Sequence, residues 1–407
     1  MDSEVATILR EKGLDANTEL WLQRLEEATN SDVERVLSEP AGSYSLPRLA
    51  TLVSPAAENY LEQMAQAAHT LTVQRFGRTI RLYAPLYLSN YCSNSCRYCG
   101  FNKDNKSERI RLNVDEALEE ASIIAAEGFR DILLVSSEDR EFVSVDYLAG
   151  LAEKLRATFG SISMEVYQMS SGEYARLFEA GIEGVTLYQE TYDRQAYEYY
   201  HPAGAKSDYD GRLTTPDAIA AAGMREVGLG VLLGLADWRI ETLALAEHAH
   251  HLMKRYWKSH VSLSFPRLRP INSSCVLRPP KGVPYGSASC VTDDTDHAIR
   301  DTQYALRDKN LVQMITALRL CFADAGLVLS TRENARLRDN LMKLGITKMS
   351  AGSKTNPGGY SGRSDAVEQF KIDDSRRATE VAAVIASQGF EPVWKDWDRA
   401  FLGNQGK

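Results

Sequence analysis

The chain is poor in cysteine, with six among 407 residues, too few for a small secreted domain built on disulfides. It has no excess of basic residues either: Lys+Arg 47 against Asp+Glu 55 give a net charge of −8, which disfavours a general nucleic-acid binder. No run comes near the roughly eighteen consecutive apolar residues of a membrane-spanning helix. Acidic Asp2 and Glu4 stand where a secretion signal carries positive charge. These absences predict a globular protein of the reducing cytoplasm.

A regular alternation of helical and strand patterns begins near residue 79. In one unit Asn113 and Glu116 form a helix-capping pair, Gly128 ends that helix, and an apolar strand follows at 132–136. Eight strands are expected, at 81–87, 132–136, 163–168, 184–189, 227–233, 261–265, 327–330 and 346–350. Eight strands with helices between them predict an α/β fold, a (β/α)8 TIM-like barrel, with its chemistry at the strands' carboxyl ends.

Three segments follow from this pattern. They are an N-terminal helical extension (1–78), the barrel (79–352), and a C-terminal segment that closes the barrel (353–407). The Pro-, Gly- and Ser-rich stretch 273–308, which contains Cys275 and Cys290, is expected to be an inserted surface loop.

Two further features receive structural interpretations. Cys321 lies on an apolar helical face and is expected in the core. The histidine tract at His248, His250 and His251 is expected on an exposed helical face rather than at a metal site.

The other three cysteines lie close together after the first predicted strand. Cys92, Cys96 and Cys99 have the spacing C-x3-C-x2-C. A [4Fe–4S] cluster is normally held by four cysteine thiolates, so three ligands on one loop leave one iron open to a small chelating ligand. Zinc is the rival interpretation, but a structural zinc site needs a fourth Cys or His in suitable spacing, and the sequence shows none.

With Tyr98 before the last cysteine, this motif resembles the signature of the radical S-adenosylmethionine superfamily. From about residue 30 onward, apart from 273–308, the chain resembles the tyrosine lyase family of thiamine biosynthesis, 2-iminoacetate synthase. The segments that carry this resemblance are APLYLSNYCSNSCRYCGF (84–101), YQETY (188–192), SFPRLRP (264–270), LSTRE (329–333), SKTNPGGY (353–360) and PVWKDWD (392–398).

The resemblance implies a radical lyase. The family cleaves the Cα–Cβ bond of L-tyrosine to 2-iminoacetate (dehydroglycine) and p-cresol, and it splits S-adenosylmethionine into methionine and 5′-deoxyadenosine. A closed barrel suits such chemistry because it keeps water away from a reactive radical.

The resemblance also assigns residues that bind the cofactor. Tyr98 is expected to pack on the adenine. Ser136, Ser137 and Glu138 occupy the family's Gly-Gly-Glu position, which binds the methionyl amino group, although two serines replace the glycines. Glu190 is expected at the ribose hydroxyls or the amino group, and Arg212 at the cofactor's carboxylate, which a planar guanidinium pairs with in bidentate fashion.

Substrate residues are expected at the ends of later strands. Arg332 is the expected partner of the tyrosine carboxylate, with Arg267 and Arg269 as rivals. Ser350 and Lys354 are expected to line the pocket.

Other functions stay open at this point. The tyrosine lyase of hydrogenase maturation carries a second cluster on C-terminal cysteines, and no cysteine follows Cys321 here. Tryptophan-cleaving relatives, or a non-catalytic iron–sulfur or zinc protein, are further alternatives. The resemblance implies thiazole synthase as a partner that consumes 2-iminoacetate, and a flavodoxin or ferredoxin as electron donor.

Overall fold

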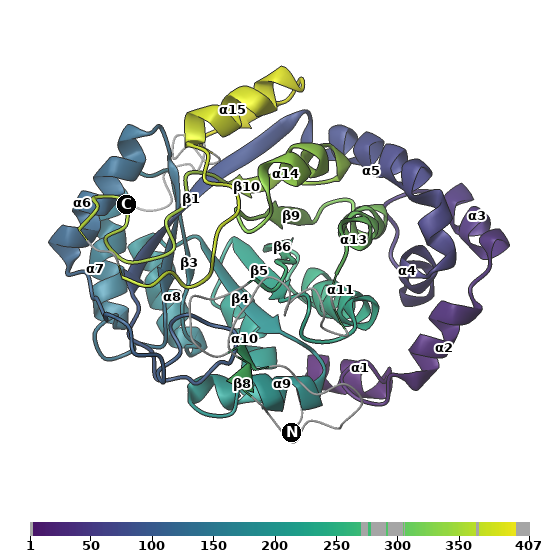
Figure 1. Ribbon diagram of the computed structural model, residues 1–407, viewed down its shortest axis with the longest axis horizontal. Coiled ribbons are helices and arrows are strands. Elements are labelled where there is room, and N and C mark those ends of the chain that lie inside the picture. Colours follow the sequence, from purple (N-terminus) through teal and green to yellow (C-terminus); the bar gives the residue numbers. More distant parts are fainter. Residues whose placement is uncertain are drawn as a thin grey trace.

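Eight parallel strands close into a barrel in the computed structural model, which describes residues 3–269, 276–277, 290–291, 304, 306–363 and 366–395 (Figure 1). The last barrel strand pairs with the first, Lys348–Ser350 lying against Arg81–Tyr83. The barrel strands are β1 (Thr79–Ser89), β2 (Asp131–Ser136), β3 (Ser161–Glu165), β4 (Gly184–Glu190), β5 (Glu226–Val231), β6 (His260–Ser264), β9 (Gly326–Leu329) and β10 (Lys348–Ser350). The predicted (β/α)8 barrel is confirmed.

Helices cover the outside of the barrel, where their apolar faces pack on the strands. They are α6 (Val114–Ala126), α7 (Val145–Leu155), α8 (Ser171–Ala180), α9 (Arg194–Tyr200), α10 (Tyr209–Ala221), α11 (Trp238–Arg255), α13 (Asp308–Cys321), α14 (Ala335–Leu341) and the 3-10 turns η2 (Ala205–Ser207) and η3 (Met342–Leu344). The capping pair that the sequence predicts is present: Glu116 N–H donates to Asn113 Oδ1 over 3.0 Å, and Asn113 N–H donates to Glu116 Oε2 over 2.8 Å. Cys321 is buried as expected.

A further set of helices precedes the barrel. It consists of α1 (Glu4–Glu11), α2 (Glu19–Glu27), α3 (Asn30–Ser38), α4 (Leu46–Val53), the 3-10 turn η1 (Ala56–Tyr60) and α5 (Leu61–Phe76). In Figure 1 these purple and blue helices wrap around the outer side of α11 and α13, and α4 and α5 contact α13 directly. The N-terminal extension therefore adds a second layer of helices outside α11 and α13 on one side of the barrel.

One expectation about local structure is wrong, and one strand was not predicted. The C-terminal tail contains a strand that the sequence did not predict, β11 (Glu391–Val393), which follows α15 (Ala378–Ser387) and pairs with the start of β1. The histidine tract is not exposed as a whole, because His248 and His251 are buried. His251 Nε2 lies 2.8 Å from Asp217 Oδ1, and His248 Nδ1 lies 2.9 Å from the Tyr192 hydroxyl, so two side chains that the sequence pattern placed in solvent bond inside the protein.

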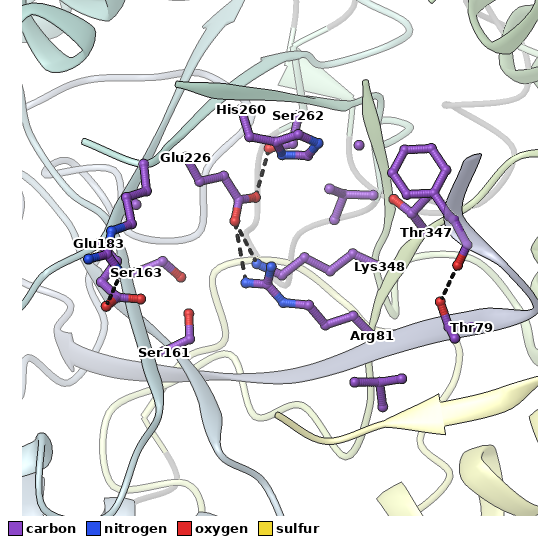
Figure 2. Close-up of a pocket in the computed structure, with 16 residues that line it drawn as sticks. Thr79, Arg81, Ser161, Ser163, Glu183, Glu226, His260, Ser262, Thr347 and Lys348 are labelled. Atoms are coloured by element: carbon purple, nitrogen blue, oxygen red, sulfur yellow. Dashed lines mark hydrogen bonds and ion pairs between the residues drawn. The ribbon is translucent and has the colours of Figure 1, made fainter. Parts of the chain in front are cut away.

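Charged residues fill the amino-terminal end of the barrel (Figure 2). Arg81 pairs with Asp131 and, over 3.3 Å, with Glu226; Lys348 lies 3.6 Å from Glu226. Burial opposes ionisation of Glu226, but the positive charges of Lys348 and Arg81 outweigh it and hold its pKa well below the ordinary value. Because these charges neutralise one another at the end opposite to the strands' carboxyl ends, we assign them to stability.

The expected insertion 273–308 lies mostly outside the described residues. Within it, β7 (Val276–Leu277) pairs antiparallel with β8 (Cys290–Val291); Cys275 lies outside the described residues. Of the helices described, none is long and apolar enough to cross a membrane.

Candidate active site

The three cysteines of the predicted cluster motif line one cavity at the carboxyl end of β1, here called the cysteine cavity. None of them forms a disulfide. Burial raises the pKa of Cys96 to about 11 and that of Cys99 to about 12, because an apolar environment disfavours the thiolate. A bound metal reverses this preference, since it binds the thiolate itself.

The arrangement of the cysteines fits an iron–sulfur cluster better than a zinc ion. In the described part of the chain, no three His, Cys, Asp or Glu side chains converge on a single ion. Structural zinc needs four ligands around one centre, whereas the thiolates of a [4Fe–4S] cluster bind different irons. Three thiols that share a cavity without sharing a centre therefore suit the cluster.

The loop that carries the three cysteines (residues 90–101), here called the cluster loop, is held in place by Asn94. Its amide donates to Glu138 Oε2 over 3.2 Å, and its carbonyl accepts from the Lys206 N–H over 2.9 Å. Gly204 has a φ of +100°, and a Cβ there would lie 2.2 Å from Asn94 Oδ1. The loop thus docks against a turn that requires glycine.

Tyr98 is fixed at the wall of the cysteine cavity by a buried histidine. His201 Nδ1 lies 2.8 Å from the carbonyl oxygen of Tyr197, so this nitrogen carries the proton. His201 Nε2 therefore accepts from the Tyr98 hydroxyl over 2.7 Å. Burial lowers the pKa of His201 well below its usual value, which keeps the ring neutral and this orientation stable.

Of the two serines at the end of β2, Ser137 bonds to the backbone between β1 and the cysteines, and Ser136 bonds to Ser137. Ser137 Oγ donates to the carbonyl oxygen of Ser89 over 3.2 Å and also to that of Tyr91, while Ser136 Oγ donates to the Ser137 carbonyl oxygen over 3.0 Å. Both residues and Glu138 line the cysteine cavity. The Ser137 hydroxyl therefore turns toward the backbone of the loop that carries the cysteines.

Glu190, a strained residue at the end of β4, lies near two cationic side chains that line the cysteine cavity. Glu190 has a φ of +71° after an irregularity in the β4–β5 pairing, and such strain in a non-glycine residue is concentrated at functional sites. Its Oε1 lies 2.5 Å from Lys206 Nζ and 4.0 Å from Arg212 Nη2. Arg212 also donates to the Tyr188 carbonyl oxygen.

A second cavity, here called the inner cavity, lies next to the cysteine cavity toward the middle of the barrel. Tyrosines and hydroxyl-bearing side chains form much of its wall, and Arg332 and Glu165 line both cavities. The inner cavity is lined by Tyr83, Pro85, Tyr87, Leu133, Val135, Glu165, Tyr188, Pro266, Ser330, Thr331, Arg332, Ser350, Ser353, Thr355, Gln369 and Phe370.

The structure distinguishes the three arginines that the sequence predicted as candidates for binding the substrate carboxylate. Arg267 and Arg269 both pair with the buried Glu333, and Arg269 also with Asp373 over 3.0 Å. Arg332 packs on Phe370 with its guanidinium carbon 3.5 Å from the ring centroid, and within the described residues it has no carboxylate partner. Arg269 and Lys354 line neither cavity, whereas Ser350 lines the inner one.

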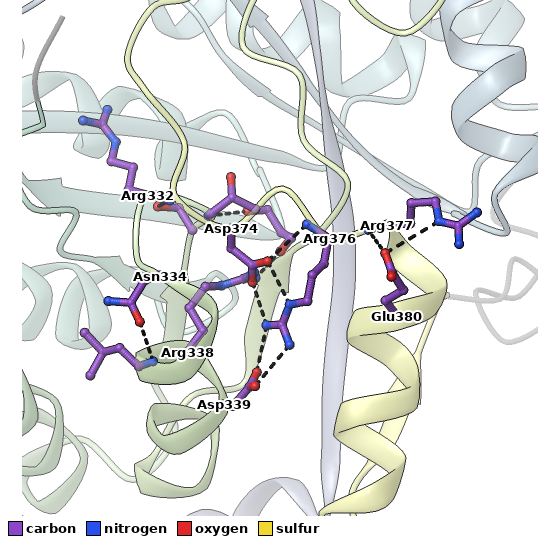
Figure 3. A network of polar contacts seen from close by, with 12 residues as sticks. Arg332, Asn334, Arg338, Asp339, Asp374, Arg376, Arg377 and Glu380 are labelled. Atoms are coloured by element: carbon purple, nitrogen blue, oxygen red, sulfur yellow. Dashed lines mark hydrogen bonds and ion pairs between the residues drawn. The ribbon is translucent and has the colours of Figure 1, made fainter.

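The C-terminal segment completes both cavities. It brings Gln369, which accepts from the Tyr87 hydroxyl over 2.7 Å, and Phe370. A buried network anchors the segment (Figure 3): Arg338 pairs with Asp374 and donates to the Ser350 carbonyl oxygen.

At Gly100 this segment and the cluster loop approach each other closely. The Gly100 N–H donates to the Gln369 carbonyl oxygen over 2.9 Å, and a Cβ there would lie 2.3 Å from the Glu368 carbonyl oxygen. We expect Gly100→Ala to push the two apart, lowering stability by about 1–3 kcal/mol and reducing turnover. Thermal unfolding with a product assay measures both effects. Gly150→Ala is the matched control, since Gly150 lies in α7 with open space around it; equal behaviour of the two variants would contradict the prediction.

Several residues at the site were missed by the sequence analysis. Lys206 sits on a 3-10 turn, and Gln369 and Phe370 sit on irregular backbone, so no periodic pattern marked them. Glu165 was detectable, because it is a charged residue within an expected strand whose other members are mostly apolar.

Comparison with known proteins shows which families this chain is similar to. The model of the Radical SAM superfamily matches residues 86–246, and that of the Biotin and Thiamin Synthesis associated domain matches residues 264–391. The 2-iminoacetate synthases of Escherichia coli (strain K12) and Salmonella typhimurium are each 42% identical over 93% of this chain and 94% of their own. Among solved structures, the hydrogenase maturase HydG gives a TM-score of 0.81 at 30% identity, covering 93% of this chain and 80% of that one.

A closed barrel whose first strand leads into a three-cysteine loop defines a radical S-adenosylmethionine enzyme, and the superfamily match agrees. Its cofactors are a [4Fe–4S] cluster and S-adenosylmethionine. The identity over nearly the whole chain shows that it belongs to the 2-iminoacetate synthase family.

Proposed function

We propose that this chain is a carbon–carbon lyase that cleaves L-tyrosine between Cα and Cβ, giving 2-iminoacetate and p-cresol with methionine and 5′-deoxyadenosine, and so supplies the thiazole moiety of thiamine. The observation that carries this is the pairing of a cysteine-lined cavity with an adjoining inner cavity, in a chain 42% identical to 2-iminoacetate synthases. The inner cavity holds Arg332, which has no carboxylate partner among the described residues.

The residues around the cysteine cavity suit an S-adenosylmethionine molecule. When bound, the cluster supplies the electron that splits this cofactor and generates the 5′-deoxyadenosyl radical. Arg212 presents a guanidinium for the methionyl carboxylate, and Glu138 and Glu190 present carboxylates for the amino group and ribose hydroxyls. Tyr98, whose hydroxyl is held by His201, offers its ring to the adenine.

The inner cavity suits a tyrosine side chain. Its wall of tyrosines and hydroxyl groups matches an aromatic ring with one polar end. Ser353 Oγ is buried without a hydrogen-bond partner, and we assign it to the phenol. Burial of the substrate between the barrel and the C-terminal segment excludes water from the reaction.

Arg332 is expected to hold the substrate carboxylate. Arg332→Gln removes a charged bidentate donor, so kcat/KM for tyrosine should fall roughly 10- to 100-fold, mainly through KM. Steady-state p-cresol formation measures this. Arg255→Gln, at an exposed residue on the end of α11, is the control and should leave kcat/KM unchanged. An unaltered KM in Arg332→Gln would return the assignment to Arg267 or Arg269.

Anaerobic reconstitution of the chain with iron and sulfide tests the activity itself. Reduction in the presence of tyrosine should give p-cresol and 5′-deoxyadenosine, with a cluster signal perturbed by S-adenosylmethionine. Tyrosine and tryptophan offered together test substrate choice, since p-cresol reports cleavage of tyrosine. Zinc in place of iron, or no 5′-deoxyadenosine, would contradict the proposed function.

Two partners and a compartment complete the proposal. Because 2-iminoacetate hydrolyses readily, we propose direct transfer to thiazole synthase, and a flavodoxin or ferredoxin as the electron donor. Free thiols at Cys92, Cys96 and Cys99 need a reducing compartment, which supports the cytoplasm.

A further inference from the structure

We propose that Glu165 binds the ammonium group of the substrate tyrosine and takes one proton from it, so that the amino acid reacts as a neutral amine. The inference rests on the proposed function and adds a residue and a protonation state to it.

The first support is position. Glu165 is the last residue of β3, so its side chain lies at the end of the barrel where the cluster loop emerges. Of the residues that line both the cysteine cavity and the inner cavity, two are charged, Glu165 and Arg332. The proposed function places the reacting Cα of the substrate at this junction, because the cofactor would occupy one cavity and the aromatic ring the other.

The second support is that this carboxylate has no partner among the described residues. Glu165 and Arg332 form no ion pair with each other within 4.0 Å, and neither forms an ion pair with another described residue. Elsewhere at the site, carboxylates are engaged: Glu190 with Lys206 and Glu333 with Arg267. Two opposite, separated charges at one junction match the zwitterionic head of an α-amino acid.

The proposed proton transfer depends on the burial of Glu165. Burial raises the pKa of Glu165 to about 7, with the negative charge of Glu190 adding to the effect. A carboxylate whose proton affinity is raised in this way accepts a proton more readily than an exposed one. In the step proposed, an N–H bond of the ammonium breaks, its electron pair stays on nitrogen, and the proton forms an O–H bond on Glu165. The neutral amine that remains is one proton closer to the imine nitrogen of 2-iminoacetate than the ammonium is.

Several charged and titratable groups face Glu165 and enter its titration. The negative charge of Glu190 disfavours ionisation of Glu165, and the positive charges of Lys206, Arg212 and Arg332 favour it. These groups are Glu190 and Tyr188 of β4, Lys206 of η2, Arg212 of α10, Arg332 after β9, and Tyr83 and Tyr87 of β1. The tyrosine hydroxyls stay neutral because burial raises their pKa values.

Glu165→Gln in the cluster-loaded enzyme tests the proposal. The substitution keeps the shape of the side chain and removes its charge and its ability to accept a proton. We expect p-cresol formation to fall about 100-fold, while the cluster signal perturbed by S-adenosylmethionine persists. In the wild type, kcat/KM should rise as the pH increases through about 7, since Glu165 must be ionised in the free enzyme; the variant should lose this rise.

Binding measurements separate a contact with the amine from a structural role. 3-(4-Hydroxyphenyl)propionate is tyrosine without its amino group. The wild type should bind tyrosine at least tenfold more tightly than this analogue, and Glu165→Gln should bind the two nearly equally. Glu241→Gln is the matched control: Glu241 is a buried carboxylate with a pKa raised to about 8 by burial, but it serves the backbone of Tyr192 instead. It should keep the rise with pH and the preference for tyrosine.

The outcomes are distinct. A wild type without p-cresol would overturn the proposed function. An active wild type with an unchanged pH profile and unchanged preference for tyrosine in Glu165→Gln would overturn the role of Glu165 alone. Loss of the cofactor-perturbed cluster signal in the variant would also overturn it, because Glu165 would then serve S-adenosylmethionine.

Discussion

Replacing Cys92, Cys96 or Cys99 singly by alanine is expected to abolish p-cresol formation. The three thiols line one cavity and none is tied in a disulfide, so we expect each to supply a third of the protein ligands of the cluster. Two thiolates cannot hold the cluster and leave one iron open for the cofactor. The iron and sulfide content should fall from about four each per chain to well below that value, and 5′-deoxyadenosine should disappear with the p-cresol.

Cys321→Ala is the control for this prediction. Cys321 is buried on α13, away from the cysteine cavity, so its loss should leave the iron content and the product yield intact. Retained turnover in any of the three cluster variants would refute the ligand assignment for that residue.

Asp374→Asn is expected to lower the free energy of unfolding by about 3–5 kcal/mol, because it leaves the charge of Arg338 buried and uncompensated. Both side chains of this pair are 0% exposed. Arg376 also pairs with Asp374 over 2.7 Å (Figure 3). Arg338 also donates to the Ser350 carbonyl oxygen. We therefore expect the C-terminal segment and the wall of the inner cavity to become less ordered together, with loss of turnover.

Denaturant unfolding of wild type and variant measures this change, read as a shift of the midpoint at constant slope. Arg377→Ala is the matched control from the same region. Its side chain is 80% exposed and lies 3.6 Å from Glu380, and exposed pairs of this kind contribute at most about 1 kcal/mol. Similar midpoints for the two variants would show that the buried pair does not hold the segment.

Periodicity in the sequence was sufficient to predict the barrel. Apolar strand runs and a capped helix such as the one begun by Asn113 depend on neighbours a few residues apart, and each of the eight expected strands is present with small shifts at the ends. The strand β11 escaped prediction because it is three residues long and pairs with the start of β1, a partner about three hundred residues away in the sequence.

The sequence by itself determined the cluster loop, since Cys92, Cys96 and Cys99 lie within one short segment whose spacing carries the chemistry. Tertiary structure alone decided that Lys206 pairs with Glu190 and that His248 is buried. It also decided that, in the part of the chain that the structure describes, Arg332 has no carboxylate partner and Glu165 lies between two cavities without an ion pair. The physical reason is that partner choice, burial and the resulting pKa values depend on side chains brought together from strands and loops far apart in the chain. The local sequence pattern does not show these contacts, because it does not tell which charged residues become neighbours once the barrel has folded.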